Sequence, residues 1–233
     1  MKIKVIIPVS TNKWNESVEA DYKRLKGPQT SIDIVHLKRG PEAIQSEYDE
    51  ANVTPFILEE VTDALRHHVD AIIVYCFSDP ALSAAREIST IPVLGIGESS
   101  QLFAMGLADR IGIIATVDQT IPKIRRKLTA KGFSSRFPSI HALNIPVLDY
   151  DQPKKVMKKA LDVVSLMVNQ DRIEALLLGC GSLFHMKERL EGHFSIPVVV
   201  PGEMALKHAE MLIELHLSHS KKSFMTPLPV KVH

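Results

Sequence analysis

Cysteine is scarce in this sequence, and an excess of charge of either sign is missing. Two cysteines among 233 residues cannot form a disulfide framework, and two alone do not complete a tetrahedral zinc site. The 28 Lys and Arg residues nearly balance the 27 Asp and Glu residues, so the chain lacks the basic excess typical of nucleic-acid binding. We therefore expect neither a metal site nor a nucleic-acid partner.

Long apolar runs are missing as well. A membrane-spanning helix needs about 20 consecutive apolar residues, and the apolar runs here are far shorter. The first of them, residues 3–7, is too short for a signal peptide and is typical of a strand. We expect no membrane association and a cytoplasmic location. Hydrophobic residues still make up 45% of the chain, which excludes low-complexity disorder and leaves ample material for a core.

Short apolar runs alternate with amphipathic stretches along the chain. Residues 3–7, 71–75 and 91–96 have the length and composition of buried strands. Between them, residues 56–65 and 80–88 follow the spacing of amphipathic helices. Strands that are apolar on both faces and separated by helices predict an α/β fold, in which helices cover both sides of a parallel sheet.

The second half of the chain repeats the first. Cys76 and Cys180 each lie one residue past an apolar strand, and their offset is 180 − 76 = 104. Two further matches at an offset of 105 are Ile91-Pro92-Val93 with Ile196-Pro197-Val198, and Gly97-Glu98 with Gly202-Glu203. We predict two similar doubly wound, flavodoxin-like lobes related by a pseudo-two-fold axis. Lobe 1 should span residues 1–98, lobe 2 residues 99–205, and residues 206–233 should return to lobe 1.

The two cysteines occupy equivalent positions in the two lobes. Ligands bind beyond the carboxyl ends of parallel strands, so Cys76 and Cys180 should flank a cleft between the lobes from opposite sides. Each cysteine precedes a predicted helix, whose N-terminus should lower the pKa of the thiol. Two such thiols could remove a proton from one face of a carbon and return a proton to the other face, without a cofactor. Duplication of two inert cysteines would give the same pattern.

Several segments of the chain resemble the aspartate/glutamate/hydantoin racemase superfamily, and within it the hydantoin and allantoin racemases. These segments are Pro41–Ala51, Cys76-Phe77-Ser78-Asp79-Pro80, Pro92–Glu98 and Leu178-Gly179-Cys180-Gly181. The resemblance implies a cofactor-independent racemase or epimerase that acts on a carbon next to a carbonyl, with Cys76 and Cys180 as the acid/base pair. The substrate it implies is a 5-substituted hydantoin or allantoin. The first loop, Pro8-Val9-Ser10-Thr11, departs from the family pattern, which predicts changed polar contacts there.

Further candidates for substrate binding come from the predicted strand ends. Side chains after the first strand of each lobe should reach the cleft, although Ser and Thr at such positions also commonly cap helices; these candidates are Pro8, Ser10, Thr11 and Thr116. Backbone N–H groups directly after the cysteines should hold the oxygens of an enolate; these belong to Phe77, Ser78, Gly181 and Ser182. The basic run at residues 123–127 is typical of a solvated helix face.

Other functions remain open at this point. An aspartate- or glutamate-type racemase would need several anion donors for a free carboxylate. A decarboxylase or a cis–trans isomerase of the same superfamily is a further possibility, although the decarboxylases keep only one cysteine. A thiol-disulfide switch would require the two cysteines to pair, and a non-catalytic relative would only bind a ligand. We also expect a homo-oligomer.

Overall fold

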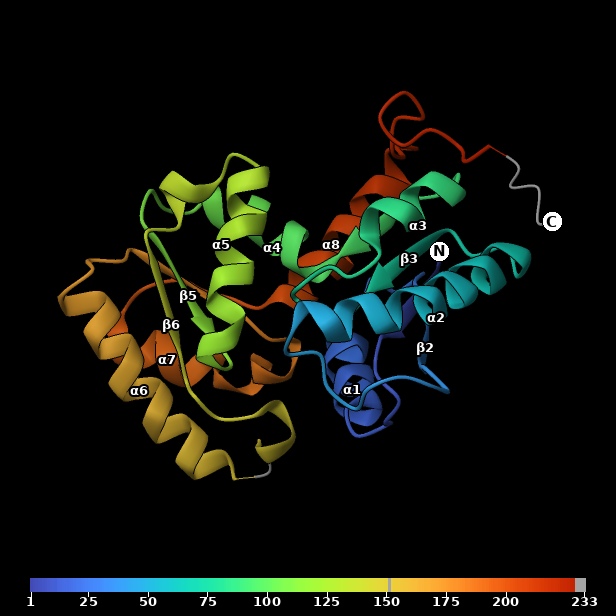
Figure 1. The fold of residues 1–233 in the computed structure, drawn as a ribbon. Helices are drawn as coiled ribbons and strands as arrows, with labels where there is room; N and C mark the ends of the chain where they lie inside the picture. The colour runs from blue at the N-terminus through green and yellow to red at the C-terminus, as the bar shows by residue number, and fades with distance from the viewer. Residues whose placement is uncertain (151, 229–233) are drawn as a thin grey trace.

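The computed structural model describes residues 1–150 and 152–228 as two lobes, each built on a four-stranded parallel sheet (Figure 1). The strand order is β2-β1-β3-β4 in the first sheet and β6-β5-β7-β8 in the second. The strands are β1 Lys2–Ile7, β2 Ser31–His36, β3 Ala71–Val74, β4 Val93–Gly95, β5 Ile111–Ala115, β6 Ser139–Ala142, β7 Ala175–Leu178 and β8 Val198–Val199. The helices are α1 Asn15–Leu25, α2 Glu47–Arg66, α3 Leu82–Ile88, α4 Ile96–Met105, α5 Ile121–Ala130, α6 Pro153–Asn169, α7 Lys187–Phe194 and α8 Pro201–Glu214.

The central strands are buried on both faces because helices cover both sides of each sheet. In lobe 1, α1 and α8 pack on one face, and α2 and α3 on the other. In lobe 2, α4 and α5 cover one face, and α6 and α7 the other. Every residue of β3, β5 and β7 is accordingly buried. This arrangement confirms the predicted α/β fold of two similar lobes, and it explains why these strands read as continuous apolar runs.

The chain crosses between the lobes twice, and the two crossing helices contact each other. Helix α4 follows the last strand of lobe 1, yet Ala104 packs in the core of lobe 2. Helix α8 follows the last strand of lobe 2, yet Ala205, Leu206 and Ala209 pack in the core of lobe 1. In Figure 1, α4 and α8 run next to each other between the two lobes. Each lobe is thus completed by a helix that follows the other lobe's last strand.

The segment after α8 lies against lobe 1. The Ser218 hydroxyl donates to the carbonyl of Thr90, and the Lys221 ammonium donates to the carbonyls of Arg86 and Glu87. The guanidinium of Arg86 also lies over the Phe224 ring, 4 residues before the end of the described chain at residue 228. Residues 229–233, which belong to the predicted returning segment, lie outside the described residues. The exact boundaries at residues 98 and 205 stay a prediction.

Several elements begin or end at other residues than the sequence predicts, among them the helix expected at residues 80–88, which begins at Leu82. The strand predicted at residues 91–96 is shorter, and α4 begins at Ile96, because the Asp79 carboxylate accepts hydrogen bonds from the backbone N–H groups of Gly97 and Glu98. Helix α2 begins at Glu47, well before the predicted start, where Ser46 and Asp49 form a capping box. No helix within the described residues is long and apolar enough to cross a membrane.

Candidate active site

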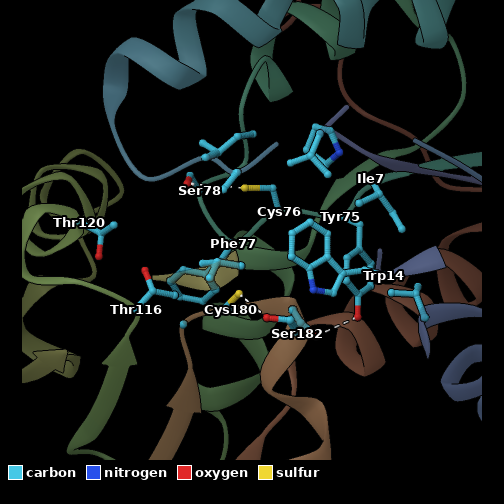
Figure 2. Close-up of a pocket in the computed structure, with 18 of the residues that line it drawn as sticks. Ile7, Trp14, Tyr75, Cys76, Phe77, Ser78, Thr116, Thr120, Cys180 and Ser182 are labelled. Atoms are coloured by element: carbon cyan, nitrogen blue, oxygen red, sulfur yellow. Dashed lines mark hydrogen bonds between the residues drawn. The ribbon is translucent and has the colours of Figure 1, made fainter. Parts of the chain in front are cut away.

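One pocket lies where the carboxyl ends of both sheets meet, and both cysteines line it (Figure 2). Its volume is about 90 Å³, enough for several water molecules or for one small organic molecule. The lining residues are Ile7, Pro8, Val9, Trp14, Val18, Ala43, Ile44, Tyr75, Cys76, Phe77, Ser78, Thr116, Thr120, Lys123, Ile124, Val147, Gly179, Cys180, Gly181 and Ser182. Both lobes therefore contribute to a single pocket.

Each cysteine is followed two residues later by a serine that contacts its sulfur. Cys76 Sγ donates to Ser78 Oγ at 3.7 Å, and Cys180 Sγ lies 3.0 Å from Ser182 Oγ. The backbone N–H of each serine acts to lower the pKa of the cysteine thiol that precedes it. Both cysteines are free thiols. The repeat has thus produced two Cys-x-Ser turns, in each of which the serine hydroxyl contacts the sulfur.

The loop that carries Cys76 is closed onto the start of α4. The N–H of Asp79 donates to the carbonyl of Cys76, and the Asp79 carboxylate accepts from Gly97 at 2.8 Å and Glu98 at 2.7 Å. A Cβ atom built on Gly95 would lie 2.1 Å from Asp79 Oδ1, so only glycine leaves room for this carboxylate. The aspartate of the Cys76–Pro80 segment therefore fixes the loop and does not reach the pocket.

The expected direction of the thiol pKa shifts is wrong. Burial raises the pKa of Cys76 to about 11, although the Ser78 amide and Lys123 act to lower it. Burial also raises the pKa of Cys180. Helix α3 begins only at Leu82, six residues after Cys76, and the segment directly after Cys180 is a 3-10 helix, Gly181–Met186. Loss of hydration therefore raises the two thiol pKa values more than the few nearby hydrogen-bond donors lower them.

Most of the predicted binding residues lie in the pocket wall. These are Pro8, Phe77, Ser78, Thr116, Gly181 and Ser182. Ser10 and Thr11 do not line it. The Ser10 N–H donates to the carbonyl of Pro41, and Thr11 Oγ1 accepts from the N–H of Lys13. Neither residue caps α1 with its side chain, so the capping alternative is wrong as well.

Lys123 is the pocket residue that the sequence analysis misassigned. It was expected on a solvated helix face, but it is 3% exposed and lies in the first turn of α5. The signal that could have found it is its position, because the first helical turn after a parallel strand faces the ligand side of the sheet. Other lining residues were not predicted either, among them Trp14, Ile44, Tyr75 and Thr120.

The pocket wall has both polar and apolar side chains. Figure 2 shows the hydroxyl groups of Thr116 and Thr120 on one side, and Trp14 and Ile7 on the opposite side, with the two cysteines between them. Val18 and Ile44 also line the pocket and pack in the same hydrophobic cluster as Ile7 and Trp14. Among the lining residues in the described chain, Lys123 is the one with a charged side chain. Such a wall suits a small uncharged molecule with a polar part and an apolar part.

Comparison with known proteins identifies the family. The profile described as Asp/Glu/hydantoin racemase matches residues 3–209, most of the chain. The chain belongs to this family. It is similar to the hydantoin racemase of Pseudomonas sp. (strain NS671), with 32% identity over 229 residues that cover 97% of this chain and 92% of the relative.

Two solved structures of the racemase family match over the full chain. The allantoin racemase of Klebsiella pneumoniae is 28% identical, with a TM-score of 0.92 and coverage of 100% of this chain and 96% of that one. The allantoin racemase of Pseudomonas fluorescens is 26% identical, with a TM-score of 0.95 and full coverage of both chains. This family member is therefore an isomerase of the racemase type, with a fold that extends over both lobes.

Proposed function

We propose that this racemase inverts the carbon next to a carbonyl in a 5-substituted hydantoin, with Cys76 and Cys180 as the two bases. The observation that supports it most strongly is the placement of both Cys-x-Ser turns around one pocket. A carbon held between two thiols has a proton acceptor on one face and a proton donor on the other. No metal or organic cofactor is needed for this chemistry.

The proposed reaction has two proton transfers. The thiolate of one cysteine takes the proton from the carbon, and the electron pair of the C–H bond moves into the neighbouring carbonyl to form an enolate. The thiol of the other cysteine then donates its proton to the opposite face, and the carbonyl re-forms. The N–H groups of Ser78 and Ser182 stabilise the thiolates, which leaves those of Phe77 and Gly181 for the enolate oxygens.

The raised pKa values fit this role. A thiolate whose conjugate acid has a high pKa is a strong base, which helps it to remove a proton from carbon. The same burial keeps the second cysteine protonated, so it can act as the acid. The working state then holds one thiolate and one thiol.

The apolar side of the pocket favours an apolar substituent on the hydantoin ring. The side chains of Trp14, Val18 and Ile44 would contact the substituent, while Thr116 and Thr120 would face the ring oxygens and nitrogens. Allantoin carries a polar ureido substituent, which would leave its hydrogen-bonding groups unpaired against this wall. Allantoin is the second candidate because two allantoin racemase structures match the whole chain.

An amino-acid substrate fits this pocket less well. A free carboxylate needs positively charged or N–H donors, and the charged lining residue Lys123 already pairs with Glu50 at 2.7 Å. We propose that aspartate and glutamate are not substrates. Chiral chromatography of both enantiomers of 5-isobutylhydantoin, 5-benzylhydantoin, allantoin and glutamate would test this order of preference. Faster racemisation of allantoin or glutamate than of either apolar hydantoin would contradict it.

Hydrogen exchange in D2O tests the two-thiol mechanism directly. Cys76→Ser and Cys180→Ser each remove one base, because a serine hydroxyl is far less acidic than a thiol. Each variant should lose racemisation in both directions yet still exchange the proton of one enantiomer, and the two variants should act on opposite enantiomers. Rates without enzyme provide the baseline. A single variant that racemises at near the parental rate would refute the mechanism.

We also propose that the enzyme is a homo-oligomer, as expected from the sequence. Helix α4 and the turn after it expose Leu102, Phe103 and Leu107, and the adjacent helix α8 exposes Met211. Light scattering after size exclusion measures the assembly, and a monomer at micromolar concentration would contradict the proposal. The cytoplasmic location stays a prediction.

A further inference from the structure

Lys123 brings a buried positive charge to the Cys76 side of the pocket. Its side chain comes from α5 of lobe 2 and pairs with Glu50 of α2 in lobe 1, with Nζ 2.7 Å from Oε1. A buried ammonium group is stable only with such a partner. The other oxygen of Glu50 contacts Lys127 at 2.6 Å, so one carboxylate is shared by two ammonium groups. The cluster therefore keeps a net charge of +1.

The Ser78 hydroxyl connects this charge to Cys76. Lys123 Nζ donates to Ser78 Oγ at 3.2 Å, and Cys76 Sγ lies 3.7 Å from the same oxygen. Since both atoms contact one oxygen, the ammonium nitrogen and the sulfur are at most about 7 Å apart. Lys127 also donates to the carbonyl oxygen of Ser78, which fixes the backbone of the turn.

The direction of the hydrogen bonds from Lys123 through Ser78 to Cys76 favours the thiolate form of Cys76. A serine hydroxyl has one proton to donate and two lone pairs to accept with, whereas an ammonium group can only donate. Lys123 therefore occupies a lone pair of Ser78 Oγ and leaves the hydroxyl proton free to point elsewhere. When Cys76 loses its proton, the Ser78 hydroxyl can turn and donate to the sulfur.

The Cys180 side of the pocket is different. The titratable groups that face Cys180 are the phenols of Tyr75 and Tyr150, whose pKa values burial raises, so both stay neutral. His185 follows in the same 3-10 helix, and burial lowers the pKa of its ring. Within the described chain, no Lys or Arg side chain has a hydrogen bond to Ser182. The Cys180 thiol therefore contacts a serine hydroxyl, as Cys76 does, but this serine has no hydrogen bond from a Lys or Arg side chain of the described chain.

We propose that Lys123, held by Glu50, is a positioning residue that stabilises the Cys76 thiolate through the Ser78 hydroxyl, and that Cys180 has no equivalent. The inference rests on the proposed role of the two thiols as bases. It gives a role to the one charged side chain among the described residues that line the pocket. It also makes proton removal by Cys76 and proton removal by Cys180 chemically unequal, since only the Cys76 thiolate is stabilised by a lysine from the other lobe.

Alkylation of a single thiol tests the proposal without reference to turnover. The chain has two cysteines, so Cys180→Ser leaves Cys76 as the one thiol, and Cys76→Ser leaves Cys180. In the Cys180→Ser background, Lys123→Met should slow iodoacetamide alkylation of Cys76 roughly tenfold at each pH between 7 and 9, because a nearby opposite charge shifts a pKa by about one unit or more. Mass spectrometry measures the rate. In the Cys76→Ser background, the same substitution should leave the Cys180 rate within about twofold.

Two further variants complete the test. Arg126→Met is the matched control, since Arg126 also joins α5 to α2 through Glu47 at 2.7 Å but does not touch Ser78, and it should leave the Cys76 rate unchanged. Ser78→Ala keeps Lys123 but removes the hydroxyl that links it to Cys76. This variant should slow the alkylation of Cys76 as much as Lys123→Met does. The proposal is overturned if either Lys123→Met or Ser78→Ala leaves the alkylation rate of Cys76 unchanged. It is also overturned if Lys123→Met slows the alkylation of Cys76 and of Cys180 by the same factor. Failure of the two-thiol racemase mechanism would appear instead in the D2O exchange experiment.

Discussion

Replacing Gly181 with alanine should show how tightly the Cys180 turn is positioned. A Cβ atom at this residue would lie 2.4 Å from Cε1 of Tyr75, whereas carbon atoms in contact are normally about 3.5–4.0 Å apart. The ring cannot simply swing away, since its hydroxyl donates to the carbonyl of Gly181 and its far edge lies against Gly202. The ring or the turn must therefore shift by about 1 Å. Overpacking of this kind costs about 1–3 kcal/mol of stability.

The same shift should affect catalysis more strongly than stability. Gly181 directly follows Cys180, and a displacement of about 1 Å at a reacting group can lower the rate about 100-fold. We expect kcat to fall by roughly this factor in Gly181→Ala, with the urea midpoint lowered in the same variant. Polarimetry measures racemisation, and circular dichroism in urea measures unfolding.

A second-site change and a control distinguish this steric cause from a general effect of alanine. In a Tyr75→Leu background the obstructing ring is gone, so Gly181→Ala should cost less than about 0.5 kcal/mol there. Gly192→Ala is the control, because Gly192 lies in α7 with open space around its Cβ position, and alanine should be neutral or slightly stabilising. If Gly181→Ala retains the parental kcat and urea midpoint, the close packing inferred here is wrong.

Two further predictions follow from the thiol environment. Because burial raises the pKa of Cys76 to about 11, deprotonation creates the base, and log(kcat/KM) should rise with a slope near 1 from pH 6 to pH 8; a flat or falling profile would contradict this. Iodoacetamide should inactivate the enzyme faster as the pH rises, and a saturating hydantoin should protect it, since both thiols line the proposed substrate pocket. Equal inactivation rates with and without the hydantoin would place the substrate elsewhere.

The fold could be predicted because its signals are local in the sequence. Buried parallel strands such as β3 and β7 appear as continuous apolar runs, and the 104-residue offset between Cys76 and Cys180 marks the duplication. The position of both cysteines at strand ends also follows, since parallel strands share one ligand-binding edge. The approximate location of the site was thus accessible before any coordinates.

The rest of the site depends on how the two lobes are packed together. Lys123 belongs to a basic run that looks solvated, and only the approach of α2 from the other lobe buries it against Glu50. Trp14 precedes α1 in lobe 1 and Val147 begins a short 3-10 helix in lobe 2, and nothing in their own sequence neighbourhood indicates that they line the same pocket. The prediction that the thiol pKa values are lowered was wrong for the same reason. Residues distant in the sequence bury both thiols, and this burial raises the pKa values more than the local N–H groups lower them.

The last prediction concerns Asp79, whose carboxylate connects the Cys76 loop to α4. Asparagine keeps the size of the side chain and tolerates the positive φ of 52° at this position, but its NH2 group would face a backbone N–H in place of an acceptor. A buried donor without an acceptor costs about 1–3 kcal/mol, so Asp79→Asn should lower the urea midpoint. It should also lower kcat, because a shift of residue 79 away from α4 would move its backbone N–H, which holds the carbonyl of Cys76. The control is Asp109→Asn, which changes an exposed carboxylate paired with Arg136 and should have little effect on either quantity. Parental stability and kcat in Asp79→Asn would show that the Cys76 loop keeps its geometry without this carboxylate.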